Sequence, residues 1–95
     1  MITHVVLYKL KENTPEIRKK MVENFYSMKG NIPALLDIEA GEDFLHVERS
    51  FDIALVCKFE SREGFAEYQA HPVHQPVKKY VHSVVEKSQS VDFEN

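Results

Sequence analysis

Apolar and polar residues in the first ten positions, MITHVVLYKL, alternate in a way that predicts a β-strand over residues 2–10. The segment is rich in β-branched and aromatic residues, which favour strands. One face of this strand would carry Ile2, His4, Val6, Tyr8 and Leu10, and the other Thr3, Val5, Leu7 and Lys9. Because both faces are largely apolar, the pattern indicates a strand that is covered on two sides.

Apolar residues then change to helical spacing, which predicts a helix over residues 15–29. Thr14 is a good N-cap residue, and Pro15 is favoured at the first helical position. Gly30 is typical of the residue that follows the end of a helix. The apolar stripe of this helix consists of Ile17, Met21, Val22, Phe25 and Met28. The basic run of Arg18, Lys19 and Lys20 is interpreted as its solvated face.

The rest of the chain predicts three more strands and two more helices. The strands are expected over residues 35–42, 52–60 and 87–93, and the helices over residues 61–70 and 75–85. In the first of these strands Leu36, Ile38 and Ala40 should share one face. The polar stretch 42–50 is expected to form an exposed hairpin loop. Pro72 should end the second helix near His71, since the residue before a proline disfavours helical geometry.

The order of these elements predicts a single α+β domain over residues 1–95 with a ferredoxin-like βαββαβ fold. Such a fold has a four-stranded antiparallel sheet whose helices all lie on one face. Two of the predicted strands are nevertheless apolar on both faces, and an apolar sheet face left in water is prone to aggregate. We therefore expect a homodimer in which two copies pack sheet to sheet, with the terminal strand in the interface.

The amino-acid composition argues against some classes of binding partner. Twelve basic and fifteen acidic residues give a formal net charge of −3, whereas nucleic acids and anionic membranes attract a concentrated basic field. No apolar run approaches the ~20 residues that span a bilayer, and the N-terminus lacks the pattern of a secretion signal. The only cysteine, Cys57, cannot form an internal disulfide, so we expect the reducing environment of the cytoplasm.

The segment YQAHPVHQPVKKY, residues 68–80, concentrates candidate chemistry. His71 and His74 are spaced so that both could bind one metal ion, with His4 or Cys57 as a third ligand. A structural zinc ion normally needs four protein ligands, so we expect no metal. His71, at a helix end, is predicted to have a structural role by donating to the last carbonyl groups of that helix.

Other cofactor and nucleophile motifs are missing. The chain contains no GxGxxG, P-loop or GxSxG sequence, so no nucleotide cofactor or activated serine is indicated. Cys57 falls in the middle of a predicted strand, where a buried thiol is usually a small hydrophobic residue. We expect no cofactor.

Four segments together resemble the stress-responsive dimeric α/β-barrel (Dabb) domain family. They are THVVLYKL, IPALLDIEAG, SFDIALVCKFESREGFAEYQAHPVH and SVVEKSQSVDFEN, which span nearly the whole chain. The resemblance implies a ferredoxin-like homodimer whose two sheets close into a barrel. Many members are stable stress-associated proteins without an assigned activity, so membership does not fix the function.

The resemblance also implies a set of site residues. A plant polyketide cyclase of this family closes a linear polyketide by aldol condensation without cofactor or metal, and its active-site pattern falls here on His4, Tyr68 and His74. In that interpretation His74 is the general base, since histidine titrates near neutrality. Tyr68 would hydrogen-bond the developing enolate, and His4 would orient the substrate.

Two other interpretations remain open. A non-enzymatic homodimer would bind a small, largely apolar or polyketide-like ligand, or only assemble, with His4 and Tyr68 as core residues. An enzyme should leave His4, Tyr68 and His74 around an open cavity, whereas a structural protein should fill that space with Phe25, Phe59 or Phe65. A monooxygenase of the related dimeric fold is the third interpretation, against which the HPxH sequence argues.

Overall fold

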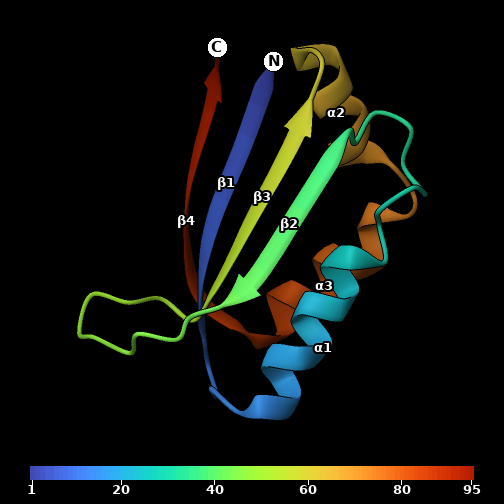
Figure 1. The fold of residues 1–95 in the computed structure, drawn as a ribbon. Helices are drawn as coiled ribbons and strands as arrows, with labels where there is room; N and C mark the ends of the chain where they lie inside the picture. The colour runs from blue at the N-terminus through green and yellow to red at the C-terminus, as the bar shows by residue number, and fades with distance from the viewer.

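The computed structural model describes all 95 residues and has the βαββαβ order that the sequence predicts, with the second helical unit split in two (Figure 1). The four antiparallel strands lie in the order β2-β3-β1-β4. All three helices cover one face of the sheet, and none is long and apolar enough to cross a membrane. The elements are β1 (Ile2–Leu10), α1 (Pro15–Tyr26), β2 (Asp37–Glu42), β3 (Ile53–Phe59), α2 (Arg62–Ala70), α3 (His74–Val84) and β4 (Val85–Glu94).

The largest difference from the predicted bounds is the end of α1. The helix ends at Tyr26 instead of residue 29, and the chain continues in tight turns in which Met28 N–H donates to Phe25 O at 3.1 Å. These turns end at Gly30, whose φ of +79° suits a residue without a β-carbon. Met28 stays fully buried, so its place in the apolar stripe was predicted correctly although the helix had already ended.

Leu36 is a second correction. The alternation placed it inside with Ile38, but β2 begins only at Asp37 and Leu36 is 52% exposed. Leu35 is buried in its place. The Leu36 N–H donates to Lys58 O at 2.9 Å, so the backbone joins the sheet before the side chains begin to alternate.

The helix-facing side of the sheet holds the core. From β1, Ile2, Val6, Tyr8 and Leu10 are buried there, as the alternation predicted, and His4 is half-buried. β3 contributes an unbroken buried row of Ile53, Leu55, Cys57 and Phe59. The helices close over these rows, with Phe25 of α1 stacked on Tyr8 at 5.4 Å between ring centroids.

The opposite face of the sheet is apolar and uncovered. Its central row joins Val91, Val5 and Val56, because Val5 pairs with Val56 on one side and with Val91 on the other. Leu7 lies in the next row beside Ala54, and Phe93 lies beside Thr3. Val91 is 63% exposed, while Leu7 and Phe93 are also exposed. The two apolar faces predicted for the first strand are therefore both present, but this chain covers only one of them.

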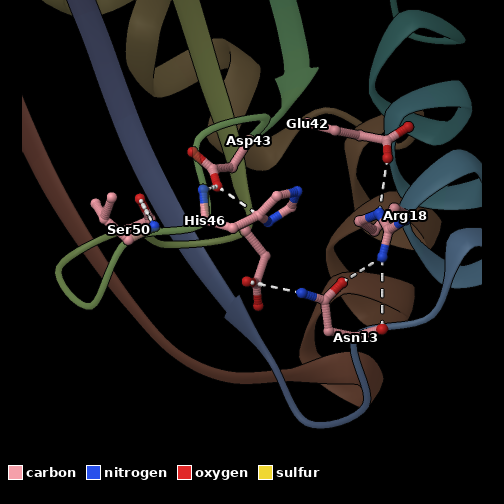
Figure 2. A network of polar contacts seen from close by, with 8 residues as sticks. Asn13, Arg18, Glu42, Asp43, His46 and Ser50 are labelled. Atoms are coloured by element: carbon pink, nitrogen blue, oxygen red, sulfur yellow. Dashed lines mark hydrogen bonds and ion pairs between the residues drawn. The ribbon is translucent and has the colours of Figure 1, made fainter.

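The basic run on α1 is not simply solvated. Arg18 is half-buried, and its Nε donates to Glu42 Oε1 at 2.7 Å while its Nη1 donates to Asn13 Oδ1 at 2.7 Å (Figure 2). The Lys20 ammonium lies 4.7 Å from the centroid of the Tyr80 ring, where it can make a cation–π contact. Arg18 thus ties the start of α1 to the end of β2, a role that helical periodicity alone does not reveal.

Asp52 should contribute strongly to stability, because it is a buried acid that satisfies two donors. Its carboxylate accepts from Leu10 N–H at 2.8 Å and from Asn13 Nδ2 at 3.0 Å. Asp52→Ala would leave the buried Leu10 N–H unpaired, a loss of about 1–3 kcal/mol. We expect thermal unfolding to show a Tm lowered by several degrees, with exposed Glu86→Ala as the control; equal Tm values for the two variants would contradict this role.

Candidate functional site

Tyr68 lies at the centre of the candidate site. It comes from α2, which begins at the N-cap Ser61, whose Oγ accepts from Gly64 N–H at 3.1 Å. The Tyr68 side chain is 1% exposed and packs on Phe59 at 5.0 Å between centroids. Burial raises its pKa well above the usual value, and the neighbouring Cys57 raises the pKa further. The hydroxyl is therefore protonated at any physiological pH.

His74 stacks directly on Tyr68. It is the first residue of α3, and its ring lies 4.3 Å from the Tyr68 ring at an interplanar angle of 28°. Its Nδ1 lies 3.3 Å from Gln69 O, and because a carbonyl only accepts, Nδ1 carries the proton and Nε2 of the neutral ring is free to accept one. Burial lowers the pKa of His74, the Gln69 contact opposes that shift, and Lys78 and His4 lower the pKa further. His74 is thus neutral at pH 7.

His4 completes the group from the first strand. Its ring centroid lies 6.4 Å from Tyr68 and 5.1 Å from Phe65. His4 Nδ1 contacts the carboxylate of Asp92, its partner in the β1–β4 register. That contact fixes the orientation of the imidazole ring, as carboxylate partners of functional histidines commonly do.

Asp92 was missed by the sequence reasoning. The closing VDFE segment could have indicated such a partner. When the first and last strands pair antiparallel, one residue of that segment must lie beside His4. The choice between Asp92 and its neighbours depends on the register, which the hydrophobic pattern did not fix since β4 is exposed along most of its length.

One cavity joins the three predicted residues. It has a volume of about 220 Å³ and lies between α3 and the strands β1 and β4, with His4, Tyr68 and His74 in its wall. Its apolar surface includes Val6, Leu55, Val77 and Val81. Polar side chains on its rim are Gln69, Lys78, His82, Ser88 and Ser90. Phe59 and Phe65 do not line the cavity, so two of the three phenylalanines that could have filled this space pack outside it.

His71 lies apart from the cavity, as the C-cap of α2. The expected donation to helix carbonyl groups is wrong for its side chain, because Nδ1 instead accepts from Val73 N–H at 3.1 Å. The His71 backbone N–H donates to Tyr68 O at 3.2 Å. These contacts shape the turn between α2 and α3 that places His74 over Tyr68.

The structure brings together no metal-binding cluster. No group of three or more His, Cys, Asp or Glu side chains is arranged to hold a metal ion, and His71 and His74 make separate contacts. Cys57 is fully buried, and burial raises its pKa to about 12 although the nearby Tyr68 hydroxyl opposes this shift. A thiol with such a pKa is not a thiolate near neutrality, which agrees with its interpretation as a small core residue.

Comparison with known proteins identifies the family and the fold. The family model described as "Stress responsive A/B Barrel Domain" matches residues 2–95. No curated protein matches the sequence. Two bacterial structures superpose well, and both are described as dimeric ferredoxin-like proteins of unknown function. The one from Bacteroides fragilis has 24% identity and a TM-score of 0.87 over 99% of this chain and 95% of that chain. The one from Thermobifida fusca has 23% identity and a TM-score of 0.89 over 99% and 90%.

Two enzymes share the fold at lower identity. A hydroxynitrile lyase from Passiflora edulis is 14% identical, with a TM-score of 0.83 over 97% of this chain and 90% of that chain. A mutant of SnoaB, a cofactor-independent oxygenase from Streptomyces nogalater, is 11% identical, with a TM-score of 0.77 over 99% and 91%. At these identities the likeness concerns the fold alone, and the two reactions differ from one another.

Proposed function

The chain belongs to the stress-responsive A/B barrel domain family, and from this premise we propose that it is a cytoplasmic homodimer that binds a small, largely apolar ligand beside His74. The observation that carries the ligand proposal is the cavity of about 220 Å³, whose wall contains the neutral His74. Its size is below the ~300 Å³ at which drug-sized sites begin, so the ligand should be small.

The homodimer proposal is supported by the uncovered sheet face. The row Val91–Val5–Val56 gives a flat apolar strip, and folded monomers rarely leave such a strip in water. The loop between β2 and β3 extends from the sheet on the side away from the helices (Figure 1). It carries the exposed side chains Phe44 and Leu45. A second copy packed on this face would cover the strip, and two structural neighbours are described as dimeric.

A ring introduced at the cavity rim should block ligand binding. Ser90 is exposed and lines the cavity, so Ser90→Phe should occupy its mouth without disturbing the core. We expect the affinity for hexanamide, a neutral probe, to fall at least about tenfold, or ~1.4 kcal/mol. Binding is measured from NMR shifts of residues that line the cavity.

The matched control is Ser83→Phe, which adds the same ring on an exposed position of α3 outside the cavity. This control should bind hexanamide as the unmodified protein does. Equal affinity of the Ser90→Phe variant, or shifts confined to other parts of the chain, would reject the cavity as the binding site.

Cofactor-independent lyase or cyclase chemistry is a second candidate, favoured by the state of His74. The unprotonated Nε2 would take a proton from the carbon next to a substrate carbonyl, and the enolate would add to a second carbonyl carbon. The new alkoxide would then recover the proton from Nε2. Tyr68, which is protonated, would donate a hydrogen bond to the enolate oxygen, and His4, held by Asp92, would orient the substrate.

Monooxygenase chemistry has weaker support. The similarity to the cofactor-independent oxygenase is one of fold, at 11% identity. Proton-transfer chemistry is better supported, because a neutral His74 is stacked on a protonated Tyr68.

A further inference from the structure

The rim of the cavity carries a lysine and a histidine but no acidic side chain. Lys78 and His82 stand one helical turn apart on α3, and both line the cavity. No Asp or Glu lines it, although the chain as a whole has a net charge of −3. The charge at the cavity mouth is therefore opposite in sign to that of the protein.

Lys78 has no carboxylate partner. The four ion pairs of the structure join His4 to Asp92, Arg18 to Glu42, His46 to Asp43 and Arg62 to Glu94. Asp92 and Glu94, which alternate with Ser90 along the same side of β4, are thus already engaged. The positive charge of Lys78 is felt within the site, since it is one of the causes that lower the pKa of His74.

The polar and apolar parts of the cavity are segregated. Lys78, His82, Ser88 and Ser90 are exposed on the rim, and they come from α3 on one side and β4 on the other. Val6, Leu55 and Val77 are buried and form the deeper wall. A ligand matched to this arrangement has an anionic end toward solvent and an apolar body inward.

We propose that the ligand is a small apolar carboxylate, with its carboxylate between Lys78 and His82 and its apolar body against Val6, Leu55 and Val77. This inference rests on the proposed ligand cavity and names the class of ligand that it takes. The cavity volume of about 220 Å³ is close to the volume that roughly seven water molecules occupy in the liquid. This size suits a short-chain or monocyclic acid. Ser88 and Ser90 supply hydroxyl donors on the opposite side of the mouth.

The test compares two probes of the same shape, hexanoate and hexanamide, by NMR titration or calorimetry. Hexanoate should bind more tightly to the unmodified protein. Lys78→Met retains most of the side-chain length without the charge, and it should weaken hexanoate about tenfold while leaving hexanamide unchanged. Salt near ~1 M, where the Debye length is about 3 Å, should reduce the preference for hexanoate.

Lys79→Met is the matched control, because Lys79 is the adjacent exposed lysine of α3 but does not line the cavity. It should leave both affinities unchanged. If hexanamide binds as tightly as hexanoate, or Lys78→Met weakens both probes equally, the carboxylate proposal fails while the ligand cavity stands. If neither probe binds in the cavity, both proposals fail.

Discussion

Val56→Glu should convert the proposed homodimer into monomers or aggregates. Val56 lies on the uncovered sheet face. It pairs with Val5 of β1, and Val5 pairs on its other side with Val91 of β4. A sheet-to-sheet interface would bury the new carboxylate against apolar side chains, and an unpaired buried charge costs several kcal/mol. Size-exclusion chromatography with light scattering would distinguish a mass near 11.1 kDa from twice that value.

The control for this prediction is Ser83→Glu, which adds the same charge to the helical layer, where the dimer would not be affected. It should remain dimeric. If Val56→Glu leaves an unaltered dimer, the interface lies elsewhere on the molecule. An unmodified protein that sediments as a monomer at low micromolar concentration would remove the homodimer altogether.

The element order was predictable because strand and helix periods differ clearly along this chain. The alternation in residues 2–10 assigned each side chain of β1 to the correct face, and Met21 and Phe25 were correctly placed in the core. The first and last residues of the elements were less predictable. At Met28 a tight turn continues the helical pattern of buried residues, and at Leu36 the backbone joins the sheet before the side chains begin to alternate.

The candidate site could be predicted only in part, because its residues come from four separate elements. His4, Tyr68 and His74 were identified through the family resemblance, and the structure places them around one cavity. Asp92 and Lys78 depend on strand register and on the facing of α3, which no local pattern specifies. Polar residues that serve a site break the simple alternation of apolar and polar positions, so they are the ones that such patterns describe least well.

His74→Ala should remove most of any proton-transfer activity while the fold is retained. If His74 is the general base, the loss should be about 10²–10⁴-fold in the rate at which a linear polyketone substrate cyclises. Tyr68→Phe keeps the stacked ring and deletes only the hydroxyl, so it should reduce the rate with a smaller change in Tm. His71→Ala, outside the cavity, should mainly lower Tm because it removes the acceptor of Val73 N–H.

The pH dependence separates the role of His74 in chemistry from a role in packing. Because burial lowers its pKa in the folded protein, the unfolded chain binds a proton at His74 at a higher pH than the folded one. Its contribution to stability is therefore complete above the unfolded value of ~6.5 and declines as the pH falls through the lowered pKa. His74→Ala should flatten this decline in stability. If the unmodified protein has a proton-transfer activity, its rate should persist below pH ~6.5, where an ordinary histidine is already protonated. Variants of His74 and Tyr68 that only lose Tm, with rates unchanged on every substrate tested, would show that the stacked pair is architectural.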